Sequence, residues 1–82
     1  MTVAEVRPYQ GKKAIVRLLN GEVATVQIIY VDAEYEDIIV DVVQTNRPEN
    51  YQQSGAAYAI SVADIISVEE ISDSPTTQTG LR

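Results

Sequence analysis

The chain of 82 residues carries six Lys or Arg against twelve Asp or Glu, so its formal net charge is −6, and 45% of its residues are hydrophobic. A chain of this length holds one small core, so a single domain is the upper limit. It contains no Cys and no His. This excludes a disulfide scaffold, a thiol nucleophile, a Ser-His-Asp triad and a zinc site built from the usual soft ligands.

Two features of the sequence bear on cellular location. Residues 1–10 lack the apolar run of a secretory signal peptide. No stretch approaches the roughly twenty consecutive apolar residues that a membrane span needs. We therefore expect a cytoplasmic protein with no membrane partner.

The first predicted element is a β-hairpin. From residue 12 onward Val and Ile predominate among the apolar residues, and these β-branched types favour strands. Residues 12–19 form a run with Val16 and Leu18 on one face, and Asn20-Gly21 follows directly. An Asn-Gly pair between two apolar runs predicts a hairpin with a type I′ turn, in which both central residues have positive φ.

The next two runs complete a three-stranded meander. Residues 22–32 are long for a strand and carry apolar side chains on both faces beyond the midpoint, which is typical of a strand that bends around a small barrel. Residues 32–37 form a tight acidic connection, and residues 38–45 form the third strand.

The second half of the chain predicts two further strands. Residues 46–55 are rich in Pro, Gly and amides and indicate an exposed loop or a projecting hairpin tip. Residues 56–62 form the fourth strand and residues 66–71 the fifth. Residues 63–65 between them indicate one turn of tight helix.

The two ends differ from the rest. Residues 2–9 predict a short helix or an arm, which Pro8 limits. From Ser72 the composition changes to Ser, Thr, Gln, Pro and Gly, which cannot bury enough apolar surface to become ordered. We therefore predict one all-β domain of five strongly bent strands over residues 1–71, and a disordered polar tail over residues 72–82.

Three segments resemble the Sm-like (LSm) family of small β-barrels. Residues 16–22 (VRLLNGE) resemble the family's first strand and hairpin turn. Residues 29–32 (IYVD) resemble the end of its second strand, and residues 36–41 (EDIIVD) its return strand. The match covers about half of the chain and implies a five-stranded Sm-like or Src-homology-type barrel.

The sequence departs from this family where the family contacts RNA. Glu36 or Asp37 stands in place of the Asn that often contacts a nucleobase, and residues 61–64 (SVAD) replace a basic-glycine pair. The second strand has Thr25 or Val26 where the family usually has Gly. Carboxylates over residues 32–41 also repel phosphate, so RNA binding does not follow from the resemblance and nucleic acid is disfavoured by charge.

The acidic connection could act as a weak cation site. Residues 32–37 place four carboxylates within six positions, and carboxylate oxygens suit calcium or magnesium. The run lacks the central Gly and the distal bidentate Glu of an EF-hand loop, and acidic turns are usually solvated. We predict no metal site and no cofactor.

Catalysis is not expected. Paired carboxylates need a pocket that raises the pKa of one of them. A five-stranded barrel of this size is filled by its own side chains. We therefore predict that the protein is not an enzyme.

Several side chains are candidates for partner binding. Tyr30 and Tyr58 fall on strand faces and are expected in the core, whereas Tyr35 and Tyr51 fall in predicted loops. An exposed tyrosine is either an interface anchor or incidental. The partner-binding candidates are Tyr35, Glu36, Asp37 and Tyr51.

Asp64 has a structural interpretation, since it is placed to cap the tight turn through a backbone N–H, a role that Ser61 could share.

Charge is unevenly distributed along the chain. Residues 1–20 contain four basic and one acidic residue, whereas residues 21–82 contain two basic and eleven acidic residues. This polarity could steer head-to-tail contacts between copies or a modest anion contact at the basic end. Ordinary solvation of an exposed strand accounts for it equally well.

The fourth predicted strand is the main candidate for self-association. Residues 56–62 carry no charge, no Pro and no Lys, and an uncharged edge strand is a template for pairing with another chain. Sm-like proteins form rings by pairing their fourth and fifth strands between neighbours. The oligomer-interface candidates are Ala57, Tyr58, Ala59, Ile60, Ser61, Ser67 and Val68.

Three functional hypotheses remain open. The first is a non-catalytic homo-oligomer of ring type that acts as a scaffold or binding module. The second is a monomeric Src-homology-type adaptor that docks a basic protein segment on acidic residues 32–41. The third is weak RNA binding at the basic end.

Overall fold

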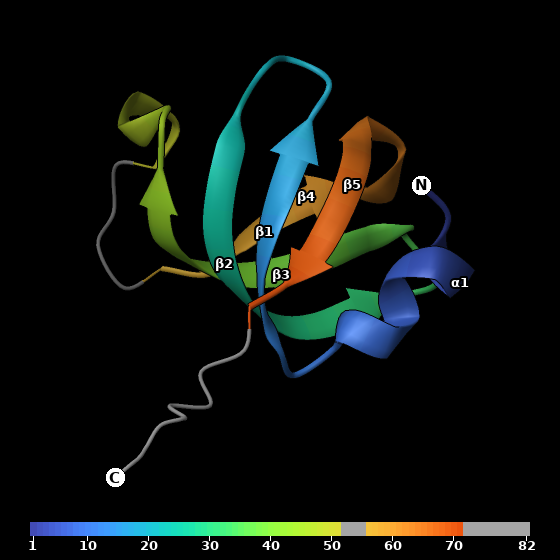
Figure 1. Cartoon of the computed structure of the whole chain (residues 1–82). Helices are drawn as coiled ribbons and strands as arrows, with labels where there is room; N and C mark the ends of the chain where they lie inside the picture. Colours follow the sequence, from blue (N-terminus) through green and yellow to red (C-terminus); the bar gives the residue numbers. More distant parts are fainter. Residues whose placement is uncertain (52–55, 72–82) are drawn as a thin grey trace, which may run out of the picture.

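The computed structural model describes residues 1–51 and 56–71 and shows one five-stranded antiparallel sheet with a short N-terminal helix (Figure 1). Its elements are α1 (Val3–Val6), the 3-10 helix η1 (Arg7–Tyr9), β1 (Lys13–Leu18), β2 (Val23–Asp32), β3 (Asp37–Thr45), the 3-10 helix η2 (Pro48–Asn50), β4 (Tyr58–Ser61), the 3-10 helix η3 (Val62–Asp64) and β5 (Ile65–Glu70). The prediction of an all-β, bent, five-stranded domain is confirmed. The predicted tail, residues 72–82, lies outside the described residues.

The strand order is β4-β3-β2-β1-β5, so β4 and β5 form the two edges of the sheet. In Figure 1, β4 passes behind β1 and β2, because the sheet curls over its own concave face. The two edges approach at η3, yet β4 and β5 do not pair with each other. The sheet is therefore barrel-like and open along one seam.

Alternating side chains fill the concave face. Val16 and Leu18 of β1 are buried as expected, while Arg17 between them is exposed. Such period-two alternation is what a sheet with one buried face requires. The core comprises Val6, Ala14, Val16, Leu18, Ala24, Val26, Ile28, Val31, Ile38, Val40, Ile60, Val62 and Ile65.

The predicted bend in β2 is a β-bulge. Ile28 pairs with Val40 and Tyr30 with Ile39, so Ile29 is the extra residue. Ile29 and Tyr30 are both exposed, so the expectation that Tyr30 lies in the core was wrong, and Val31 is buried again. The bulge reverses the alternation halfway along the strand and increases its twist, so both halves of β2 face one core without a glycine.

The β1–β2 hairpin forms where predicted, but its turn differs from the predicted type. Gly21 has φ +90°, and Glu36 is the sole non-glycine residue with positive φ in the described ranges, so Asn20 does not adopt the type I′ conformation. The Gly21 N–H donates to the Leu18 carbonyl at 3.0 Å, and the Leu18 N–H donates to the Glu22 carbonyl at 2.9 Å. This pattern is a three-residue loop in which only the glycine is left-handed.

The N-terminal segment covers one end of the core. Thr2 and Glu5 form a capping box, in which each side chain accepts from the other's backbone N–H. Val6 of α1 is fully buried. Within the described residues, no helix is long and apolar enough to cross a membrane.

Side-chain hydrogen bonds hold the chain after β3 against the β1–β2 turn. Asn46 accepts from the Val23 N–H at 2.9 Å and donates to the Gly21 carbonyl at 3.3 Å, and Arg47 donates to the Asn20 carbonyl at 3.0 Å. The start of the predicted loop 46–55 is therefore tethered to the sheet and contains η2. Residues 52–55 lie outside the described part of the chain.

Replacing Val6 with Ala tests the docking of α1. Removal of two buried methyl groups should lower the free energy of unfolding by about 2 kcal/mol, measured by urea denaturation. The matched control is Ile66→Val, because Ile66 is exposed and should change stability by less than about 0.5 kcal/mol. Equal effects for the two variants would contradict the packing of α1 on the core.

Candidate functional site

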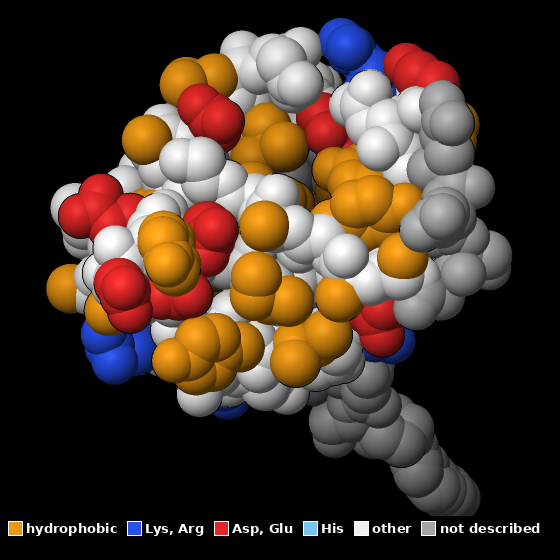
Figure 2. Space-filling view, turned by 180° about the vertical axis from the view of Figure 1, so that it is seen from behind, with side chains coloured by type: hydrophobic (Ala, Val, Ile, Leu, Met, Phe, Trp, Pro, Cys, Tyr) orange, Lys and Arg blue, Asp and Glu red, His pale blue; other side chains and the backbone are white. Residues whose placement is uncertain are grey.

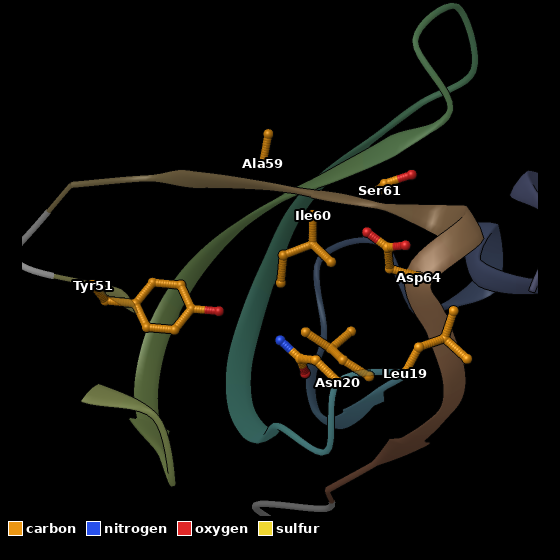
Figure 3. A pocket seen from close by; sticks show the side chains of 8 residues that line it. Leu19, Asn20, Tyr51, Ala59, Ile60, Ser61 and Asp64 are labelled. Atoms are coloured by element: carbon orange, nitrogen blue, oxygen red, sulfur yellow. The ribbon is translucent and has the colours of Figure 1, made fainter. Parts of the chain in front are cut away.

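A pronounced hollow among the described residues lies beside the β4 edge. It encloses about 320 Å³, near the lower end of the range for ligand pockets. Three segments far apart in the sequence line it (Figure 3). They contribute Leu18, Leu19, Asn20, Tyr51, Ala59, Ile60, Ser61 and Asp64. We call this hollow the seam pocket.

The walls of the seam pocket combine apolar and acidic groups. Leu18 and Ile60 come from the edge of the core. Figure 3 shows the Tyr51 ring entering from one side with its hydroxyl pointing inward, and the Asp64 carboxylate at the other side near Ser61. Among the lining residues that the structure describes, none is a Lys or Arg. The pocket therefore suits an apolar or cationic group.

Unpaired backbone groups border the pocket on the β4 side. The Val62 N–H donates to the Glu36 carbonyl at 2.9 Å, in line with the β3–β4 pairing of Ile60 with Ile38. Antiparallel pairs alternate between hydrogen-bonded and non-hydrogen-bonded. The N–H and C=O groups of Ala59 and Ser61 consequently point away from β3, toward the open edge.

A buried carboxylate fixes the Tyr51 wall. Glu22 is only 2% exposed, and its Oε2 accepts a hydrogen bond of 2.6 Å from the Thr45 hydroxyl. The Tyr51 hydroxyl also donates to Glu22. The Tyr51 ring meets the Tyr58 ring edge to face, with centroids 4.9 Å apart. Two hydroxyl donors thus compensate the burial of one carboxylate.

This environment keeps the Tyr51 hydroxyl protonated. Burial raises the pKa of Tyr51 well above its usual value, and the hydrogen bond to Glu22 and the charge of that carboxylate raise it further. Since the phenol does not ionise at neutral pH, it continues to donate to Glu22. The wall of the pocket is therefore held by a contact that persists over the physiological pH range.

The predicted partner-binding residues do not form one site. Tyr35 is 72% exposed at the β2–β3 turn, next to Glu36 (φ 54°) and Asp37, the first residue of β3. Tyr51 lies instead in the seam pocket and is half-buried. The expectation that Tyr51 belongs to an exposed loop is corrected, because Glu22 and Tyr58 hold its ring against the sheet.

The Asp32 side chain organises the acidic turn through hydrogen bonds to the backbone. Asp32 accepts hydrogen bonds from the N–H groups of Glu34 and Tyr35 at 2.9 and 3.2 Å. Such an Asx turn is a common structural use of aspartate. Across residues 1–51 and 56–71, no group of three or more acidic side chains is arranged to hold a metal ion.

The predicted interface residues occupy both edges of the sheet. Tyr58 to Ser61 form β4, preceded by exposed Ala57, whereas Ser67 and Val68 lie in β5. Within β4, Ile60 points into the core while Ala59 and Ser61 are exposed. Val68 packs against the core. The β4 edge thus presents the exposed side chains of Ala59 and Ser61 to a neighbour, whereas the Val68 side chain of the β5 edge packs against the core.

Two residues assigned a capping role do not have it. η3 has no side-chain hydrogen bond at its N-cap, Ser61. The Asp64 carboxylate lines the seam pocket. The turn instead closes through the backbone, where the Ile65 N–H donates to the Val62 carbonyl. The capping prediction for Ser61 and Asp64 was wrong.

Sequence reasoning missed Glu22 and Thr45. Glu22 is two residues before Ala24 and four before Val26, both buried, so the alternation of β2 already placed it on the core side. A charged residue at a core-facing position indicates a buried polar cluster or a site. That signal was available from the sequence.

Glu22→Ala tests the buried cluster. The variant leaves the hydroxyls of Thr45 and Tyr51 without their acceptor, so the free energy of unfolding should fall by about 2 kcal/mol. Urea denaturation of Glu34→Ala, which removes an exposed carboxylate, serves as the control and should show little change. A loss below about 0.5 kcal/mol for Glu22→Ala would contradict the role of the cluster.

The raised pKa of Tyr51 predicts a loss of stability in alkali. A raised pKa means that the folded state holds this proton more tightly than the unfolded state. The stabilisation is full below the ordinary tyrosine pKa of 10.0 and declines as pH rises above it. Tyr51→Phe should show a smaller decline than the parent in urea denaturation at successive pH values. Tyr35→Phe is the matched control and should follow the parent.

Comparison with protein-family models, with curated proteins and with solved structures gives no match for this chain.

Proposed function

We propose that the protein is a non-catalytic, Sm-like barrel that assembles with copies of itself into a ring-type homo-oligomer and acts as a scaffold or binding module. The observation that carries the proposal is the open seam, where both edge strands keep unpaired backbone groups. In each contact, β4 of one copy would pair with β5 of the next.

The β4 edge is suited to strand addition. Ala59 and Ser61 direct their N–H and C=O groups outward, and the four residues of β4 carry no charge. Natural edge strands usually carry charge, proline or a cover that prevents pairing with another chain. Within the described residues, none of these features is present on β4 itself.

The β5 edge offers a matching set of groups. The Ile71 N–H donates to the Lys13 carbonyl at 2.9 Å, in line with the pairing of Ala14 with Glu70 and Val16 with Val68. By the same alternation, Val68 and Glu70 direct their backbone groups away from β1. Each edge thus presents two residues with a donor and an acceptor apiece.

The difference between the two edges favours a ring. A contact between unlike surfaces leaves one edge free on each terminal copy, and such contacts either close into a ring or extend into a filament. η3 separates β4 from β5 along the chain, and the two strands do not pair with each other, so each edge is available to a different neighbour. In a closed ring, every β4 edge pairs with the β5 edge of a neighbouring copy.

The seam pocket supports the same arrangement. A strand added to β4 would place one inward-facing side chain opposite Ile60, where the pocket lies. The apolar walls formed by Leu18 and Leu19 would then cover that side chain. Figure 2, seen from the β4 side, shows a hollow bordered by hydrophobic side chains and a carboxylate.

Ser61→Pro tests the proposal. Ser61 has φ −65°, the value that proline imposes, and its N–H does not serve the β3 ladder, so the domain should fold. The proline removes an outward donor and obstructs the edge. Light scattering after size exclusion should give more than two chains of 9.0 kDa for the parent and at most two chains for the variant.

Ser61→Ala is the matched control and should retain the parental mass, because its backbone N–H is intact. Far-ultraviolet circular dichroism verifies the fold of each variant. A parent of 9.0 kDa would contradict assembly and favour the monomeric adaptor. An oligomer that Ser61→Pro leaves intact would contradict the β4 edge as the contact.

A further inference from the structure

The outer face of the sheet carries one row of three polar side chains with opposite charges at its ends. Lys13 of β1 pairs with Gln27 of β2, and Gln27 pairs with Asp41 of β3. Gln27 is held in place because its Nε2 donates to the Gly11 carbonyl at 3.0 Å. The row therefore reads basic, neutral and acidic across three adjacent strands.

A shallow hollow lies beside this row on the same face. It encloses about 280 Å³ and is lined by Ile15, Val23, Thr25, Gln44, Thr45 and Asn46. Val43 lies at the neighbouring register shift of β3 and is 58% exposed. The face thus presents both a projecting apolar side chain and a recess of moderate polarity.

We propose that this face binds a second copy of the chain about a two-fold axis parallel to β2. Such a rotation exchanges β1 with β3 and preserves position along the strands. Because Lys13 and Asp41 share one row, Lys13 of each copy then faces Asp41 of the other. Gln27 faces its counterpart near the axis.

The same rotation places the apolar groups together. Thr25 pairs with Ile15 on one side and Gln44 on the other, so Val43 of one copy comes over β1 of the other, near Ile15. Packed sheets lie about 10 Å apart. The projecting Val43 side chains and the hollow on each copy are compatible with this spacing.

Charge favours a second copy over an unrelated partner. The chain has a net charge of −6, so two copies repel each other overall and need local complementarity to associate. The Lys13–Gln27–Asp41 row supplies this complementarity twice in one closed contact. A purely basic partner would meet Lys13 with like charge.

This contact is distinct from the seam. It uses the outer face of β1, β2 and β3, whereas strand addition uses the backbone of β4 and β5. Either contact can form without the other. The two therefore require separate experiments.

Exchange of charge between copies gives the sharpest test. Lys13→Glu places like charges in both contacts of a dimer, and so does Asp41→Lys. Each variant alone should associate at least about tenfold more weakly than its parent, which corresponds to about 1.4 kcal/mol. In an equimolar mixture of the two variants, the introduced carboxylate of one copy faces the introduced ammonium of the other. The unaltered Asp41 and Lys13 also face each other, so association should be restored.

The variants are made in the Ser61→Pro background, so that edge pairing does not contribute, and association is measured by sedimentation velocity at low and high salt. Weaker association of the parent in high salt supports the charged row. Val43→Ser should also weaken dimerisation, while Tyr35→Ser, which alters the distant β2–β3 turn, should not. Circular dichroism confirms folding.

A Ser61→Pro protein that is monomeric at every concentration overturns the inference, as does a mixture that behaves like its separate components. If Ser61→Pro keeps the full parental mass while the mixture still rescues association, the outer-face contact stands and the proposed ring contact fails. If Ser61→Pro lowers the mass to a charge-dependent dimer, both contacts are supported.

Discussion

The bulge in β2 is the constraint on which the rest of the structure depends. A single inserted residue, Ile29, reverses the inward alternation between Ile28 and Val31. Without it, the second half of the strand would direct its apolar side chains to solvent, and β3 and β4 could not curl over the core. The curl brings β4 past β1, and the seam pocket forms where the β1–β2 turn meets the β4 edge.

A buried polar cluster ties this pocket to the hairpin that frames it. Glu22 sits at the start of β2, Thr45 at the end of β3 and Tyr51 beyond η2. The carboxylate accepts from both hydroxyls. A buried hydroxyl left without its acceptor would destabilise the fold by more than the hydrogen bond stabilises it. The chain after β3 is therefore positioned by hydrogen bonding as much as by apolar contact, and one wall of the pocket has a defined geometry.

Much of the fold could be read from the sequence because its signals are local. Val16 and Leu18 indicated the buried face of β1, and Gly21 indicated the hairpin. The apolar residues on both faces of β2 indicated that this strand bends. Predicted strand ends differ from the observed ones by one or two residues, because the last residues of a strand pair according to the adjacent strand and not according to the local sequence. The turn type was wrong because a type I′ turn is only one of the loops that Asn-Gly can enter, and strand twist and the following hydrogen bonds select between them.

The site was less accessible to sequence reasoning because it joins residues that are remote in the chain. Asp64 and Ser61 were assigned to a cap, which is their commonest local role, while the actual pocket depends on the curl of the sheet. Tyr51 follows polar residues and so was assigned to a loop, although Glu22 holds it. Sequence polarity did identify β4 as uncharged, but the outer-face row of Lys13, Gln27 and Asp41 becomes visible only once the strand pairing is known.

The tyrosine pair at the pocket has a practical consequence. The chain contains no Trp and no Phe, and five Tyr, so its near-ultraviolet spectrum comes from tyrosine alone. Tyr51 and Tyr58 meet at an interplanar angle of 85° with centroids 4.9 Å apart, so each ring is part of the other's fixed, asymmetric environment. A change at the seam that moves the Tyr51 ring against Tyr58 is therefore expected to alter the near-ultraviolet circular dichroism, without a dye, a label or an engineered chromophore.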